Sequence, residues 1–199
     1  TKQMILIGKI RKIAEETGPK LAEIRQELHR HPELGMNLPR THEIISRELK
    51  KIPGLRVQEH KAGGSGIIAV MEGGKKEGKT VLLRADIDAL PVEEEGDCGF
   101  KSENPGCMHA CGHDGHGEWL IGAAMILSKI RMEWGGCIKF VLQPGEEVGK
   151  GADILISEDR VLEDPDVDMA FAAHGWPSIE SGRIGIARRY AFGCVGSFR

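Results

Sequence analysis

The segment TVLLRADID (residues 80–88) begins as an apolar run and ends in two aspartates. A short run rich in Val and Leu, bounded by a Gly-containing turn, predicts a strand in the interior of a sheet. Other segments of the chain share this composition. We therefore predict further strands at LRVQEH (55–60), GIIAVME (66–72), CIKFVLQP (137–144), DMAFAAHG (168–175) and GRIGIA (182–187).

Helical periodicity occupies much of the remaining chain, before the first of these strands and between the later ones. Apolar residues recur at helical spacing, as in Leu21, Ile24 and Leu28, and Pro32 ends that segment. Helices that alternate with apolar strands predict an α/β fold whose sheet is covered on both faces. The predicted helices span 2–16, 19–31, 40–51, 115–132 and 151–157.

The composition is that of an ordinary globular protein. The 199 residues are 40% hydrophobic and 29% charged, with a net charge of −3 and mixed signs. No basic face suggests a nucleic-acid partner, and no apolar run approaches the length of a membrane span. The start has no signal-peptide layout, so we expect a soluble, cytoplasmic protein. Five cysteines, an odd number in a chain of this size, argue against a disulfide framework.

One motif is misleading. GGKKEGKT (73–80) matches the phosphate-loop pattern G-x-x-x-x-G-K-[ST]. That loop binds phosphate only where it opens a helix, whose amino end holds the anion. Here a predicted strand follows, so we interpret the segment as a turn between strands.

Polar side chains gather where the predicted strands end. In open α/β sheets the chemistry lies at these ends and in the loops that follow. The coincidence predicts an active site built from RADIDALP (84–91), CMHACGHDGH (107–116), QPGEE (143–147) and AAHGWP (172–177).

Two of these clusters carry the chemistry of metal-assisted hydrolysis. Cys111 and His113 lie two residues apart, so their side chains leave the same side of an extended chain, and together they suit zinc. Glu146 and Glu147 are adjacent, so one can bind metal while the other faces the attacking water as a general base.

Each of these residues also has an ordinary structural interpretation. A single cysteine is usually a small core residue, and His174 could be a hydrogen-bonded core histidine. An isolated Glu-Glu pair is usually a solvated turn. A structural zinc site is a further alternative, with ligands Cys107, Cys111, His113 and His116.

Taken in order, the motifs resemble the amidohydrolase branch of the aminoacylase/carboxypeptidase family of metallopeptidases, which includes hippurate hydrolases, N-acyl-amino-acid amidohydrolases and auxin-conjugate hydrolases. The resemblance implies a zinc-exopeptidase-like three-layer sandwich, with a mixed sheet and helices on both faces. It is carried by LHRHPELG (28–35), LLRADIDALPVEE (82–94), GCMHACGHDGH (106–116), FVLQPGEEVGKGA (140–152) and AAHGWPSIESGRIGI (172–186).

The resemblance also implies a site with two divalent ions, Zn²⁺ or Mn²⁺. By position in the motifs, Cys111 is a bridging thiolate and His113, Glu147 and His174 are further ligands. Glu146 is the general base, which takes a proton from a metal-activated water that attacks an amide. The implied substrate is an N-acyl amino acid or a small peptide.

Other residues of the motifs receive lesser roles. Asp88 is expected to orient the site from behind the ligands. His29 and His31 are interpreted as structural, near a helix end. No role follows for Asp86, Asp114 or His116.

The resemblance covers only part of the family pattern. Family members continue beyond GRIGI into a lid or dimerisation domain and a closing segment that supplies a last histidine ligand. We therefore expect residues 1–186 to be the N-terminal part of a catalytic domain, incomplete at its C-terminal side, and 187–199 to be an unassigned tail. Uncovered sheet surface would favour self-association.

A second function stays open at this point. The chain could be a non-catalytic, metal-binding half-domain that pairs with a partner chain. The Glu146–Glu147 pair favours the enzyme, because a structural zinc site needs neither a base nor an open position.

Overall fold

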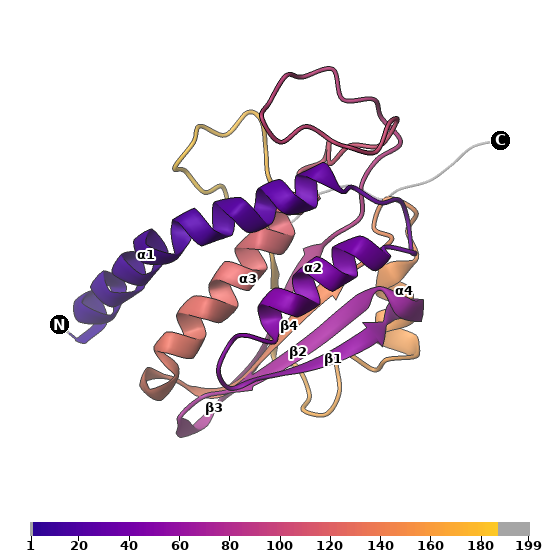
Figure 1. The fold of residues 1–199 in the computed structure, drawn as a ribbon. Coiled ribbons are helices and arrows are strands. Elements are labelled where there is room, and N and C mark those ends of the chain that lie inside the picture. The colour runs from indigo at the N-terminus through magenta and orange to yellow at the C-terminus, as the bar shows by residue number, and fades with distance from the viewer. Residues whose placement is uncertain (1, 187–199) are drawn as a thin grey trace.

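A single mixed sheet forms the middle of the molecule (Figure 1). The computed structural model describes residues 2–186. The strand order is β1-β2-β4-β3-β5; β2 is antiparallel to β1 and β4, whereas β3 is parallel to β4 and β5. The strands are β1 (Leu55–Lys61), β2 (Gly66–Glu72), β3 (Lys75–Asp86), β4 (Gly135–Gln143) and β5 (Met169–Ala172).

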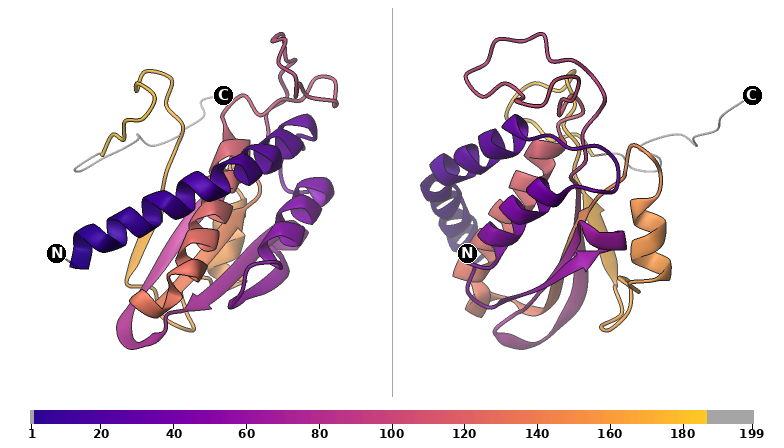
Figure 2. Two further views of the ribbon diagram at one scale, coloured as in Figure 1. Left: turned by 60° about the vertical axis from the view of Figure 1, so that its left-hand side comes forward. Right: turned by 45° about the vertical axis from the view of Figure 1, so that its right-hand side comes forward.

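Helices cover both faces of this sheet, so the predicted three-layer α/β sandwich is confirmed. Figure 2 shows the sheet nearly edge-on, with α1, α2 and α3 on one face and α4 on the other. Short 3₁₀ turns lie at Ala62–Gly64 and Arg131–Glu133. The helices are α1 (Lys2–Arg30), α2 (Pro39–Leu49), α3 (His113–Lys129) and α4 (Gly151–Ser157).

The central strand β4 shows why the apolar runs are nearly continuous. Phe140 and Leu142 are fully buried in the core beneath α1, α2 and α3. Val141, between them, points to the other face and packs in the core beneath α4, with Leu155. Because successive side chains of a strand alternate between faces, a strand covered on both sides needs apolar residues at every position.

Helix α1 is continuous, and the prediction of two helices divided near residue 17 is wrong. Pro19 lies inside the helix, where it cannot donate the usual backbone hydrogen bond. The Thr17 hydroxyl donates to the Ile13 carbonyl at 2.7 Å, in the turn before the proline. Burial of Ile24 and Leu28 in the helix-side core further stabilises the segment that follows.

The predicted strand at 182–187 is also wrong over the part that the structure describes. Residues 183–186 have no regular structure, and Ile184 is 90% exposed. Within residues 2–186 no strand pairs with this segment, and an isolated strand has no partners for its backbone groups. The last residue of this predicted strand, 187, is also the first residue of the predicted tail (187–199), and the whole tail lies outside the described residues.

The segment 73–80 enters a strand rather than a helix, so it is not a phosphate loop, but the predicted turn is too long: only Gly73 and Gly74 connect β2 to β3, and residues 75–80 already belong to β3. A second connection, residues 87–112, is long and carries only isolated bridges, Leu34 with Ala89 and Leu90 with Met108.

Among the residues described, no helix combines the length and apolar character that a membrane crossing requires.

Candidate metal centre

The parallel strands β3, β4 and β5 end at the same edge of the sheet, and the amino end of α3 begins there. Asp86 is the last residue of β3, and the Glu146–Glu147 loop follows β4. His174 follows β5, and His113 opens α3. The topology therefore brings the four predicted polar clusters to one place, as expected from the ends of parallel strands.

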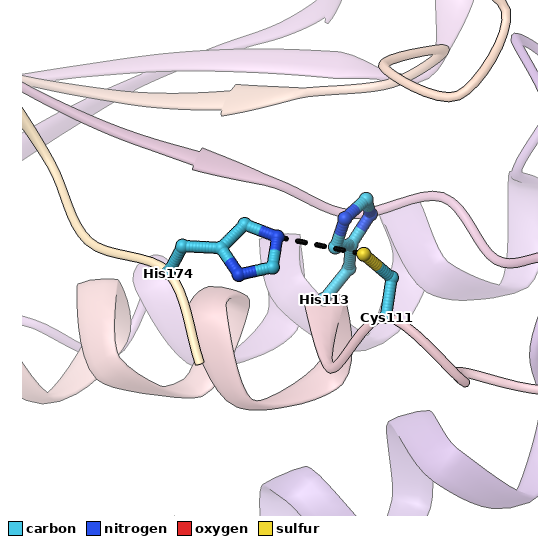
Figure 3. A group of neighbouring side chains, drawn as sticks. All are labelled: Cys111, His113 and His174. Atoms are coloured by element: carbon cyan, nitrogen blue, oxygen red, sulfur yellow. Dashed lines mark hydrogen bonds between the residues drawn. The ribbon is translucent and has the colours of Figure 1, made fainter. Parts of the chain in front are cut away.

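Cys111, His113 and His174 converge at this edge (Figure 3). The Cys111 Sγ lies 3.4 Å from His174 Nε2, and one ligand atom from each of the three residues falls within 4.8 Å of the others. Gly112 separates Cys111 from α3 and has φ of +84°, a left-handed conformation that glycine adopts without strain. This turn lets both flanking side chains reach the same point.

His113 is the buried centre of the cluster. Its side chain is fully buried, and neither ring nitrogen makes a hydrogen bond to any described residue. Its Nε2 lies 3.7 Å from Asp86 Oδ2, 3.7 Å from Glu147 Oε1 and 4.0 Å from Glu146 Oε2. Its Nδ1 lies 3.5 Å from Asp88 Oδ1. A buried imidazole without a partner is costly unless something else binds it.

Asp88 holds the loop that carries the glutamates. Its Oδ1 accepts the backbone N–H of Glu146 and its Oδ2 that of Glu147, each at 3.1 Å. Both carboxylate oxygens are buried and are used to fix backbone rather than to face outward. Asp88 thus fixes the backbone of the loop; its orienting role in a metal site stays a prediction.

Asp86 and His116 form a link for which the sequence predicted no role. Asp86 Oδ1 lies 2.6 Å from His116 Nδ1, and His116 Nε2 accepts the backbone N–H of Gly175 at 2.9 Å. His116 therefore donates from Nδ1 to Asp86 and ties the loop after β5 to α3. Its i, i+3 spacing from His113 places both on one helix face, and this was the available sequence signal.

The structural zinc site considered from the sequence is not assembled. Both nitrogens of His116 are engaged by Asp86 and Gly175. The Cys107 thiol is buried and donates to the Pro32 carbonyl at 3.3 Å. Neither residue is oriented toward a shared ion with Cys111.

The charge at this edge is strongly unbalanced. The guanidinium of Arg84 donates to Asp86 Oδ2 at 2.7 Å and is the cation paired with this group. The carboxylates around His113 are Asp86, Asp88, Glu146 and Glu147. Four carboxylates against one guanidinium, in a partly buried place, favour the binding of divalent cations.

The pKa values of the site follow from this environment. Burial and the Glu147 carboxylate raise the pKa of Cys111 to about 11. Burial acts to raise the pKa of Asp86, but the hydrogen bond from His116 and the charge of Arg84 outweigh it and lower that pKa to about 2. Burial, with the charges of Asp86 and Glu147, raises the pKa of Glu146. A Cys111 thiolate would therefore need a bound cation.

The residues present fit metal ions. His113 offers its unpartnered ring nitrogens to a cluster of soft and hard donors. Three groups of converging ligand atoms share it: Cys111, His113 and His174; His113, Glu146 and Glu147; and Asp86, His113 and His116. The mixture of thiolate, imidazole and carboxylate is one that zinc accepts.

A separate buried network lies behind the cluster. His29 Nδ1 bonds to Asp114 Oδ2 at 2.9 Å, and His29 Nε2 lies 3.2 Å from Glu94 Oε1. His109, also buried, has no hydrogen-bond partner among the described residues, and burial lowers its pKa to about 4. The interpretation of His29 as structural agrees with this arrangement.

The chain is similar in sequence to known hydrolases over most of its length. The chain is 35% identical over 177 residues to an N-acyl-L-amino acid amidohydrolase of Geobacillus stearothermophilus, covering 89% of this chain and 46% of the relative. It is 40% identical over 184 residues to thermostable carboxypeptidase 2 of Saccharolobus solfataricus, covering 90% and 45%. The chain spans about half the length of these curated relatives.

A solved structure agrees in fold. The chain superposes on the YXEP protein of Bacillus subtilis, described as a dinuclear metal-binding peptidase, with a TM-score of 0.76 and 36% identity. The match covers 82% of this chain and 44% of that one. The model of peptidase family M20/M25/M40 matches residues 82–189, a segment that contains every predicted ligand. The chain therefore belongs to peptidase family M20/M25/M40.

Proposed function

We propose that the protein of which this chain forms part is a metal-dependent hydrolase that cleaves the amide bond of N-acyl amino acids or small peptides. The observation that carries the proposal is the buried, unpartnered imidazole of His113 among carboxylates, beside a further glutamate. The names of the relatives, an amidohydrolase and a carboxypeptidase, support this class of substrate.

The ligands of two divalent ions, Zn²⁺ or Mn²⁺, would be Cys111, His113, Glu147 and His174. Bound there, the ions supply Lewis-acid activation of the amide carbonyl and of the attacking water. The convergence of Cys111, His113 and His174 supports this set, as does the position of Glu147.

Glu146 would act as the general base. Its side chain is 41% exposed, so a water and a substrate can reach it, and its raised pKa suits a group that must take up and return a proton. It would take a proton from the attacking water and deliver it to the leaving nitrogen of the amide. Asp88 fixes the backbone N–H of Glu146 and so limits the positions its carboxylate can adopt.

The position of this chain within the whole protein is also proposed. Residues 1–186 would form the N-terminal part of the catalytic domain. The alternative is a non-catalytic half-domain that binds metal and pairs with a partner chain. The exposed Glu146 favours the enzyme, because a structural metal site leaves no base facing solvent.

Hydrolysis of a panel of N-acetyl and N-benzoyl amino acids, with added Mn²⁺ or Zn²⁺, tests the proposal. Glu146→Gln should retain metal and lose about 10²–10⁴-fold in rate. Hydrolysis by that variant at the parent rate would refute the base assignment. A folded, metal-loaded chain without turnover on any member of the panel would mean that turnover needs a part of the catalytic domain that this chain does not contain.

A further inference from the structure

A second group of metal-ligating side chains lies between the carboxyl end of α1 and the long connection 87–112. His29 Nε2, Glu94 Oε1 and Cys98 Sγ all fall within 4.8 Å of one another. Nε2 of His29 lies 3.2 Å from that oxygen, and the Cys98 thiol donates to it at 3.5 Å. None of these residues belongs to the proposed metal centre.

The remaining atoms of the group are already held by other partners. His29 Nδ1 bonds to Asp114 Oδ2 at 2.9 Å, and Arg25 Nε donates to the same oxygen at 3.2 Å. When one ring nitrogen of a histidine donates to a carboxylate, as Nδ1 does here, the other nitrogen, Nε2, is held in a fixed orientation in which it can bind a metal. Glu94 Oε2 accepts the Ser102 N–H at 2.6 Å, which leaves Oε1 for the cluster.

Burial favours a bound ion while leaving a path to it. The side chains of His29 and Glu94 are 7% and 4% exposed, whereas Cys98 is only partly buried. An ion could therefore enter from the side of Cys98 and then be largely shielded from water. Imidazole, thiolate and carboxylate are all ligand types that zinc binds in proteins.

The charges balance with and without the ion. Without metal, the hydrogen bond with Asp114 raises the pKa of His29, and a protonated His29 together with Arg25 would offset Glu94 and Asp114. A divalent ion would displace one proton from His29 Nε2 and one from the Cys98 thiol, so the net charge of the buried group is unchanged. Such an exchange avoids the cost of leaving an uncompensated buried charge.

We propose that His29, Glu94 and Cys98 form a second zinc-class site, with its fourth position open to water. The ion would fasten the connection 87–112, which carries the proposed ligand Cys111 near its end, to the carboxyl end of α1. This site goes beyond the proposed function and does not depend on it.

Alkylation of the full chain tests the site, with zinc as the probe. The chain is freed of metal and alkylated with and without excess zinc, and each cysteine is then quantified by mass spectrometry. Zinc at about ten times the dissociation constant should slow alkylation of Cys98 by about tenfold. Cys111 in the same digest reports the proposed metal centre separately, and Cys137, buried in β4, gives a baseline.

Glu94→Gln should remove the protection of Cys98, whereas Glu93→Gln, on the same loop, should leave it intact. The Glu93 carboxylate accepts the Gly106 N–H and does not contact the cluster. An unchanged Cys98 rate in saturating zinc would overturn the proposal, as would protection that persists in Glu94→Gln.

A second measurement covers the case in which Glu94→Gln does not fold. Equilibrium dialysis should show one zinc fewer per chain in Cys98→Ser than in Cys107→Ser. Cys107 is the matched control, because its thiol contacts the Pro32 carbonyl and lies outside the proposed ligand set. Equal zinc content in the two variants would overturn the proposal.

Discussion

The proposed metal centre has a buried side and an exposed side. On the buried side, His113 and Asp88 are fully enclosed, at the ends of α3 and the central strands. On the exposed side, His174 follows β5, whose four residues are all exposed and which, among residues 2–186, pairs with β3 alone at one edge of the sheet. By contrast, β4 lies in the middle of the sheet, between β2 and β3 (Figure 1).

This difference indicates how each side is held in place. The glutamate loop is fixed by backbone hydrogen bonds to Asp88 and by a strand with two neighbours. The loop with His174 is fixed to α3 by the hydrogen bond from Gly175 to His116. We expect the buried side to be preorganised for metal, and the exposed side to gain order when metal binds.

The largest expected effect separates the central strand from the edge strand. Phe140 is fully buried in β4, so Phe140→Ala should cost about 3–5 kcal/mol in the free energy of unfolding. Phe171 is 57% exposed in β5, so Phe171→Ala should change it by about 0.5 kcal/mol or less. Urea unfolding of both variants checks the contrast. Similar losses in the two would mean that β5 is as well packed as β4.

The next effect concerns the preorganised side alone. Asp88→Asn replaces one acceptor oxygen by an NH₂ group, which cannot accept the N–H of both Glu146 and Glu147. We expect a loss of about 10–100-fold in zinc affinity, as for other groups that orient ligands. Calorimetric titration measures it, with Asp153→Asn on the exposed surface of α4 as the control. Unchanged affinity in Asp88→Asn would show that the loop does not need this anchor.

The smallest effect uses the opposite edge strand, β1, which is tied to α2. Hydrogen bonds from Lys50 and Ser46 lower the pKa of Glu59 from 4.5 to about 2. Because the folded-state pKa is lowered, this stabilisation is present above about pH 4.5 and is lost as the pH falls toward 2. Glu59→Gln should therefore lower the free energy of unfolding by about 1 kcal/mol or less near neutral pH. Below pH 4.5 the stability of the variant should fall less steeply with pH than that of the parent.

Chemical unfolding of the Glu59→Gln variant at a series of pH values measures this effect. If parent and variant lose stability in parallel between pH 4.5 and 2, the ion pair does not anchor β1, and the two edges would be alike in this respect.

The sequence predicted the layers better than the connections between them. Apolar runs such as GIIAVME and CIKFVLQP indicate strands because both of their faces are buried. The insertion of β4 between β2 and β3 could not be predicted, since strand order depends on contacts distant in sequence. The continuous α1 was missed because tertiary packing outweighs the local effect of Pro19.

The site was predictable where a motif carried it. The structure brings together Cys111, His113, Glu147 and His174, although their roles as ligands stay predictions. The link from Asp86 through His116 to Gly175 was not predicted, because it joins residues far apart in the chain. The sequence likewise does not indicate that His109 is buried without a hydrogen-bond partner among the described residues.

Metal binding by His113→Ala tests the central claim most directly. Equilibrium dialysis with Zn²⁺ or Mn²⁺ should show that the parent chain binds metal at the proposed centre and that the variant loses it, while circular dichroism reports an intact fold. His31→Ala is the control, a partly exposed histidine outside the cluster. Equal metal content in His113→Ala and the parent would contradict the account, because the buried imidazole would then have no role in holding an ion.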